Sequence, residues 1–185
     1  MEALSNKKNF LSSYPEEKFN PLTKKGVIDA RRKAFALRKY KIDIIYASPL
    51  TRTKQTAEII SEVLKVPVIF DHRLREIDLG ELNGKPYEEF DKFYYNEFTN
   101  KRDLEKKPLN GESLNDVRKR VINFILDLEK LHKGKNILIV SHGATLWMLE
   151  NEMKALNNED IVNFKVKSYE LGELRKVDFM IVPRN

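Results

Sequence analysis

The sequence predicts a three-layer α/β/α sandwich with a mainly parallel central sheet and a hairpin at its C-terminal edge. Short apolar runs rich in β-formers, at residues 42–48, 66–70 and 136–140, alternate with longer segments whose apolar residues recur at helical spacing. This alternation is typical of parallel strands whose connecting helices cover both faces of the sheet. At 185 residues, the chain is long enough for one domain with a complete hydrophobic core.

The first half of the chain contains two predicted helices and two predicted strands. Residues 22–40 carry apolar residues at helical spacing, namely Val27, Ala30, Ala34 and Leu37. The strand "IDIIYAS" follows, and a second helix is expected to begin at Ser48, which can cap free N–H groups, with Pro49 in its first position. The second strand is "VPVIF", and residues 71–110 form an irregular region rich in aromatic residues.

The second half begins with a capping signal, in which Asp116 follows Ser113 by three residues. The helix that follows has one apolar stripe, formed by Val117, Val121, Phe124, Leu128 and Leu131. The strand "NILIV" leads to another helix with one apolar side, formed by Leu146, Leu149, Met153 and Leu156. Two extended runs around Gly172, within residues 162–182, predict the edge hairpin.

Composition excludes several classes of protein. Lys and Arg give a net charge of +6, but they are interleaved with 28 acidic residues, which favours a mixed-charge surface and no nucleic-acid partner. The absence of cysteine excludes disulfides, a thiol nucleophile and Cys-based zinc sites. No apolar run approaches membrane-spanning length, and residues 1–10 contain no signal-peptide core. We therefore expect a cytoplasmic protein without a membrane partner, and the sequence makes no prediction about its oligomeric state.

Polar side chains follow the three predicted strands at their carboxyl ends, where function gathers in parallel sheets. Arg52 falls in the first turn of a helix, so its guanidinium and the positive helix end can both bind a phosphate oxygen. Glu76 follows the second strand and can act as a general acid if its neighbours raise its pKa. His142 follows the third strand and can donate a hydrogen bond to the same anion. This set of residues suits a phosphoryl group.

Each of these residues also has an ordinary structural interpretation. An arginine at a helix start is more often a surface ion-pair partner, and Glu76 can simply pair with Arg73 or Arg75. A histidine after a buried strand is more often a core residue than a catalyst. We favour the functional interpretation because the three side chains fall at three successive strand ends of one predicted sheet.

Five short motifs together cover nearly the whole chain. They are "NPLTKKG", "YASPLTRTKQTAEII", "LREIDLGELNG", "NGESLNDVRKRV" and "ILIVSHGATL". In this order they resemble the segments typical of the histidine phosphatase superfamily, the phosphoglycerate mutase-like proteins. The resemblance implies one phosphoglycerate mutase-like domain over residues 1–185, a small phosphorylated substrate, and neither a metal nor another cofactor.

The resemblance also implies roles for individual residues. Arg52 corresponds to the family's second phosphate-binding arginine, and His142 to the second histidine, which helps to hold the phosphate. Glu76 corresponds to the acid that protonates the leaving oxygen. The start "MEALSN" resembles the end of the family's Arg-His-Gly-Glu-x-x-x-Asn motif, with Met1 in place of the glycine and Asn6 in register as a phosphate contact.

The family's nucleophile is the histidine of that Arg-His-Gly motif, which ends a first strand in the middle of the sheet. Since these 185 residues lack the motif, we expect the strand, the first arginine and the nucleophilic histidine upstream of residue 1. His72 and His132 do not fall at the end of a first strand. Both are expected to be surface histidines.

Three functions remain in competition. We favour a phosphomonoester phosphatase that works through a phosphohistidine, because the segment between Glu76 and the Gly-Glu-Ser motif is short beside that implied for the mutases. The alternatives are a phosphoglycerate mutase and a catalytically inactive truncated member that binds phosphorylated ligands or a partner. Aromatic residues near the acid form either an apolar cap over the substrate or the buried side of a short helix: Tyr87, Phe90, Phe93, Tyr94, Tyr95 and Phe98.

Overall fold

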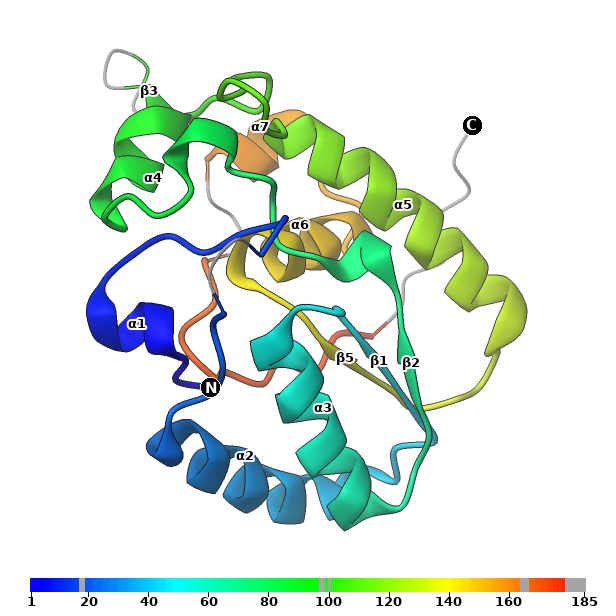
Figure 1. Ribbon diagram of the computed structural model, residues 1–185. Helices are drawn as coiled ribbons and strands as arrows, with labels where there is room; N and C mark the ends of the chain where they lie inside the picture. The colour runs from blue at the N-terminus through cyan, green and yellow to red at the C-terminus, as the bar shows by residue number, and fades with distance from the viewer. Residues whose placement is uncertain (17–18, 97–98, 100, 164–166, 179–185) are drawn as a thin grey trace.

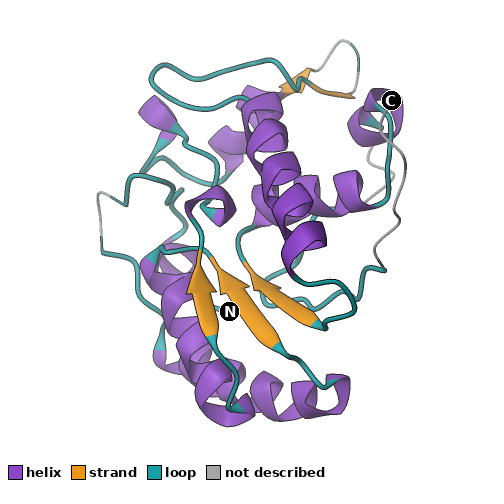
Figure 2. Cartoon of the chain, turned by 90° about the vertical axis from the view of Figure 1, so that its right-hand side faces the viewer, coloured by secondary structure: helices purple, strands orange, loops and turns teal. Residues whose placement is uncertain are grey.

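The structure is a computed structural model that describes residues 1–16, 19–96, 99, 101–163 and 167–178. Three parallel strands, β1 (Ile44–Ala47), β2 (Val68–Phe70) and β5 (Ile137–Val140), form a sheet in the order β2-β1-β5 (Figure 1). Because all three strands run in the same direction, their carboxyl ends meet at one edge (Figure 2). The predicted α/β fold with a parallel sheet is confirmed.

Helices cover both faces of this sheet. On one face, α2 (Lys24–Leu37) packs against α3 (Thr51–Leu64), and on the other, α5 (Leu114–Leu131) packs against α6 (Gly143–Met153) (Figures 1 and 2). Ile45 and Tyr46 are neighbours in β1, yet they belong to different hydrophobic cores. Successive side chains of a strand point to opposite faces, so the two cores lie on either side of the sheet. The result is the expected three-layer arrangement.

Shorter elements occupy the carboxyl edge of the sheet and the periphery. Near the N-terminus lies α1 (Leu4–Lys8), and α2 continues into the 3₁₀ turn η1 (Arg38–Tyr40). The region 71–110, predicted to be irregular, contains η2 (His72–Leu74), η3 (Gly80–Leu82), α4 (Glu88–Tyr94) and the antiparallel pair β3 (Tyr95–Asn96) and β4 (Lys101–Arg102). The last described helix is α7 (Asn158–Val162). Within the described ranges, no helix is long and apolar enough to cross a membrane.

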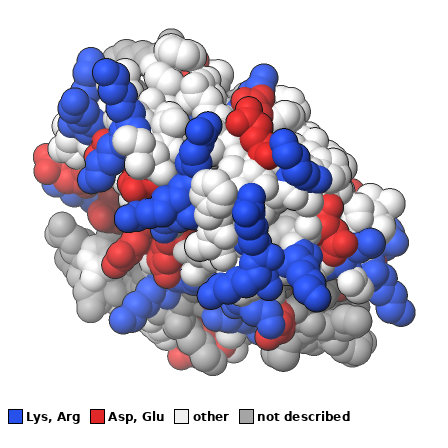
Figure 3. All heavy atoms as spheres, turned by 90° about the horizontal axis from the view of Figure 1, so that it is seen from below, with Lys and Arg blue, Asp and Glu red and all other residues white. Residues whose placement is uncertain are grey.

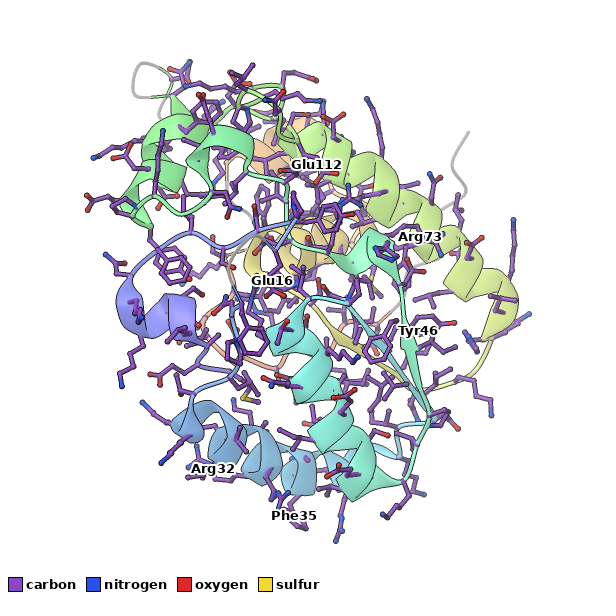
Figure 4. All side chains as sticks on the ribbon, in the orientation of Figure 1. Glu16, Arg32, Phe35, Tyr46, Arg73 and Glu112 are labelled. Atoms are coloured by element: carbon purple, nitrogen blue, oxygen red, sulfur yellow. The ribbon has the colours of Figure 1, made fainter. Side chains whose placement is uncertain are left out.

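Helix starts confirm one capping prediction and contradict another. Ser113 caps α5, since its Oγ accepts from the Asp116 N–H at 3.1 Å and its own N–H donates to the Asp116 carboxylate at 3.1 Å. The prediction that Ser48 caps α3, with Pro49 in its first position, is wrong, because that helix begins at Thr51 with Leu50 as its N-cap residue. The carboxylate of Glu16 instead accepts from the Thr51 N–H at 3.1 Å and from its hydroxyl at 2.5 Å (Figure 4).

Two residues of the predicted apolar stripes are exposed to solvent. Val27 is 39% exposed because α2 packs through smaller residues, Gly26, Ala30 and Ala34, which allow its backbone to approach its neighbours closely. Leu131 is 69% exposed at the last position of α5. The helical spacing of apolar residues therefore predicts the buried faces of α2 and α5 correctly, but it predicts them to be larger than they are.

The predicted hairpin at residues 162–182 falls partly outside the described residues. In the described part, residues 167–178, there is a turn at Leu171 and Gly172 and no strand. Gly172 has a φ of +71°, which suits glycine, and its carbonyl oxygen accepts from the Lys33 ammonium. A Cβ at this position would lie 3.2 Å from the Met1 nitrogen, so the turn lies beside the start of the chain.

Opposite charges are interleaved on the surface. Seen from below in Figure 3, Asp and Glu side chains lie among those of Lys and Arg. Exposed ion pairs such as Arg32–Asp29 at 3.3 Å and Lys135–Asp43 at 3.5 Å join the two signs. This agrees with the mixed-charge surface expected from the sequence, while the expectation of no nucleic-acid partner stays a prediction.

Gly26 marks the place where α2 meets the N-terminal segment. The Thr23 N–H donates to the Glu2 carbonyl oxygen at 3.0 Å, and a Cβ on Gly26 would overlap that same oxygen. We expect Gly26→Ala to lower the free energy of unfolding by about 1–3 kcal/mol despite the better helix propensity of alanine. Urea unfolding measures this change. Gly143→Ala is the control, because nothing lies within 4 Å of a Cβ there, and equal stability of both variants would contradict the expected clash.

Candidate active site

A cavity of about 700 Å³ opens at the carboxyl edge of the sheet. Asn6, Arg52, Glu76 and His142 all line it, from α1, α3, the loop after η2 and the residue before α6. The structure therefore brings together every residue that the sequence singled out as a site residue. Their chemical roles stay predictions.

Arg52 lies in the first turn of α3 with its side chain only 13% exposed. Its guanidinium donates to the Ser12 carbonyl oxygen at 3.0 Å and lies 3.8 Å from the Glu16 carboxylate. Burial lowers the pKa of Arg52, whereas the nearby carboxylates of Glu76 and Glu16 raise it. An arginine stays charged at neutral pH even so, and a buried positive charge at a helix N-terminus is suited to bind an anion.

His142 is buried at the N-cap position of α6. Its Nε2 lies 2.7 Å from the Ser48 hydroxyl oxygen and 3.5 Å from that of Thr53. Burial holds the pKa of His142 well below its ordinary value, and the charges of Arg52 and Arg120 lower it further. The ring is therefore neutral at pH 7, and it can donate one hydrogen bond to a bound phosphate without adding a charge.

Glu76 lies in the loop between η2 and η3, at the wall of the cavity. The backbone N–H of Ile77 donates to its carboxylate at 3.1 Å, and the backbone N–H of Thr145 lies near it. Burial raises the pKa of Glu76, although Arg52, these N–H groups and Arg120 oppose the rise. A carboxyl with a raised pKa keeps its proton closer to neutral pH, as a general acid requires.

Asn6 and an aromatic segment form the side of the cavity near α4. The Asn6 Oδ1 accepts from the Ala3 N–H at 2.8 Å, and its Nδ2 donates to the Tyr87 hydroxyl at 2.9 Å. Tyr87 and Phe90 line the cavity, whereas Tyr94 is fully buried in the core. Tyr94 thus fits the buried side of a short helix, whereas a cap over the substrate stays a prediction for Tyr87 and Phe90, and Phe98 lies outside the described residues.

The other two histidines lie away from this cavity. His72 is exposed, as predicted. His132 is not a free surface residue, since it is partly buried and its Nε2 lies 2.8 Å from the Tyr46 hydroxyl. Within the described part of the chain, His142 is the one histidine at the site, and no cluster of three metal-ligating side chains is found there or elsewhere.

The cavity continues along β5, which is an edge strand in the described part of the chain. Its floor includes Leu138, Ile139 and Val140 of this strand. Leu37 of α2 and Trp147 of α6 line its two sides, from the helix layers on the opposite faces of the sheet. No described strand pairs with this outer edge of β5, and such an edge presents N–H and C=O groups to which another strand can bond.

Sequence reasoning missed several residues that hold the site together. Ser48 was assigned to helix capping, but its hydroxyl contacts His142. Glu16 was not singled out, although it contacts both Arg52 and the start of α3. No local sequence signal marks these contacts, because each joins segments that are far apart in the chain.

Comparisons with known proteins identify the family of this chain. The family model of the histidine phosphatase superfamily (branch 1) matches residues 16–179. An uncharacterized phosphatase of Bacillus subtilis, PhoE, is 31% identical over 157 residues, covering 83% of this chain and 77% of that protein. A 2,3-bisphosphoglycerate-dependent phosphoglycerate mutase of Gloeobacter violaceus is 32% identical over 154 residues, covering 80% and 70% of the two chains.

Solved structures show the same fold. YhfR of Bacillus stearothermophilus superimposes with a TM-score of 0.72 at 30% identity, covering 86% of this chain and 79% of that one. A mycobacterial glucosyl-3-phosphoglycerate phosphatase is similar in fold, with a TM-score of 0.74 at 21% identity over 88% and 80% of the two chains. The chain belongs to the histidine phosphatase superfamily.

Proposed function

We propose that residues 1–185 form the phosphate-binding and acid part of a phosphomonoester phosphatase. The observation that carries the proposal is the convergence of Arg52, a neutral His142 and the acid Glu76 on one cavity. Arg52 binds the phosphate dianion, while His142 and Asn6 donate hydrogen bonds to its oxygens. Glu76 gives its proton to the leaving oxygen as the ester bond breaks. The substrate is a small phosphorylated compound.

We further propose that the nucleophile is a histidine outside residues 1–185, on a strand that pairs with the edge of β5 to which no described strand is bonded. Two observations support this. His72 and His132 lie away from the cavity, and Met1 lines it beside the groove along β5. A strand that leads into Met1 along this groove would end beside Arg52 and His142.

The proposed reaction has two steps. A nitrogen of the histidine attacks phosphorus, the phosphorus–oxygen bond of the ester breaks, and the alcohol leaves with the proton of Glu76. Water then attacks the phosphohistidine, releasing inorganic phosphate and restoring the histidine. The carboxylate of Glu76 takes a proton from this water.

Mutase activity is the second candidate function. It is favoured by the similarity to the Gloeobacter violaceus phosphoglycerate mutase, whereas PhoE of Bacillus subtilis favours a phosphatase. We place the phosphatase first because the segment between Glu76 and Glu112 is shorter than the one that the family resemblance implies for the mutases. Less chain is then left to exclude water from the phosphohistidine. The inactive binding member remains an alternative, and the cytoplasmic location stays a prediction from the sequence.

Phosphate binding, which needs no turnover, tests the proposed phosphate site in the 185-residue chain. We expect the 185-residue chain to bind inorganic phosphate, and His142→Ala to weaken this binding by about ten- to a hundredfold, the value of one hydrogen bond to a charged group. Isothermal titration calorimetry measures both. His72→Ala is the matched control and is expected to bind as the wild type does, since His72 is exposed and away from the cavity. A folded wild-type chain that binds no phosphate at millimolar concentration would contradict the proposal.

A further inference from the structure

Glu112 forms hydrogen bonds to the loop that carries Glu76, on both sides of that residue. Glu76 itself lies in neither a helix nor a strand, so no regular hydrogen-bond ladder holds it. The Glu112 carboxylate accepts from the Arg75 guanidinium and from the Asp78 backbone N–H, the latter at 3.0 Å. Its backbone N–H donates to the Asp78 carbonyl oxygen at 2.7 Å. Arg75 and Asp78, on the two sides of Glu76, are therefore both bonded to the side chain of Glu112, which lies in the loop that precedes α5 (Figure 4).

Arg120 of α5 holds this carboxylate in place. Its Nε and Nη2 donate to the two Glu112 carboxylate oxygens, each at 3.2 Å, and its Nη1 donates to the Arg73 carbonyl oxygen at 2.5 Å. The two side chains are 9% and 13% exposed. A buried bidentate ion pair of this kind fixes the orientation of the Glu112 carboxylate and also contributes energy. The loop that carries Glu76 is also joined to α6, because the Thr145 hydroxyl donates to the Arg75 carbonyl oxygen at 2.6 Å.

Charges from several elements act on Glu76. Arg52 of α3 and Arg120 of α5 favour its ionised form, while Tyr94 of α4 also interacts with it electrostatically. His142, neutral, precedes α6 at the same cavity, and the acid's own loop adds Arg75 and Asp78. Since Glu112 is ion-paired with both Arg75 and Arg120, its negative charge offsets theirs.

We propose that Glu112 is a positioning residue for Glu76: its carboxylate ties the loop on both sides of the acid to α5 and offsets the positive charges of Arg75 and Arg120. The inference rests on the proposed function, in which Glu76 protonates the leaving oxygen. It assigns a purpose to the Gly-Glu-Ser segment, which the sequence places before a long helix.

The titration of Glu76 itself tests this proposal. Carbon-13 NMR of the side-chain carboxyl groups in the 185-residue chain gives its midpoint, and the signal is assigned by its loss in Glu76→Gln. We expect Glu112→Gln to lower this midpoint by about one pH unit, because two positive charges are no longer offset and the loop is less firmly held. Glu112→Asp keeps the charge but shortens the side chain, so it should cause a smaller shift in the same direction.

Glu152→Gln is the matched control. Glu152 also forms a buried ion pair with an arginine of α5, Arg118, at 2.6 Å, and its loss should lower stability while leaving the Glu76 midpoint in place. An unchanged midpoint in folded Glu112→Gln overturns the proposal, and so does an equal shift in Glu152→Gln. If Glu112→Gln does not fold, Glu112→Asp is judged by the same two criteria. Because the titration needs neither substrate nor turnover, its failure is distinct from failure of the proposed function.

Discussion

Replacing Arg52 with alanine is expected to weaken binding of inorganic phosphate by about a hundredfold or more, the usual cost of removing one partner of a buried charge pair. The guanidinium is 13% exposed, so little water is available to replace it. Glu76→Gln is expected to weaken binding by less than about tenfold, because the acid acts mainly on the leaving group and contributes less to ground-state binding. Titration calorimetry of both variants with inorganic phosphate gives the comparison.

Arg32→Ala is the control for the change in net charge. Its side chain is 77% exposed on α2 and pairs with Asp29, so its loss should leave phosphate binding nearly unchanged (Figure 4). Equal losses in Arg52→Ala and Glu76→Gln would contradict the assigned roles. If Arg32→Ala weakened phosphate binding as much as Arg52→Ala does, the effect would be due to net charge alone.

The layers of the fold were predictable because the strands and helices of this chain have different periods. Ile45 and Tyr46 stand in a continuous apolar run, as expected of a strand buried on both faces, whereas Val117, Val121 and Phe124 recur at helical spacing. The edges of elements were less predictable. Ser48 satisfies the residue preference of a cap, but it contacts His142 instead, and a carboxylate 35 residues away from Thr51 takes its place.

Part of the candidate site could be predicted because topology alone brings strand ends together. Arg52 and His142 each follow a parallel strand, so they share one edge of the sheet wherever the intervening chain runs. The contacts of Ser48 and Glu112 could not be predicted in this way. Ser48 reaches His142 across 94 residues and Glu112 reaches Arg75 across 37, and pairings at this range depend on packing that no local pattern records.

Turnover is the second large effect. We expect the 185-residue chain to hydrolyse a simple phosphomonoester, p-nitrophenyl phosphate, at the background rate, because in the proposed function it binds phosphate while the nucleophile in line with the leaving oxygen lies outside residues 1–185. A chain extended upstream by a β-strand that ends in Arg-His is expected to be faster by at least about a thousandfold, since a positioned nucleophile removes most of the entropic cost of attack. Phosphate release measures both rates.

The residue at position 1 affects how far activity is restored. Extension of the natural sequence would give Arg-His-Met, which puts a larger side chain beside the phosphate than the family's glycine does. The extended chain with Met1→Gly should therefore be at least as active as the one that keeps the methionine. An extended chain with Arg-Gln in place of Arg-His is the control, and it should stay at the background rate.

Acid-labile labelling of histidine tests most directly which histidine is the nucleophile. The extended chain is incubated with a phosphorus-32-labelled phosphomonoester and quenched, and the label is mapped by peptide analysis. We expect an acid-labile phosphohistidine at the added histidine, with release of phosphate, and neither label nor turnover in the 185-residue chain. Robust turnover by the 185-residue chain with an acid-labile label on His142 would show instead that His142 is the nucleophile.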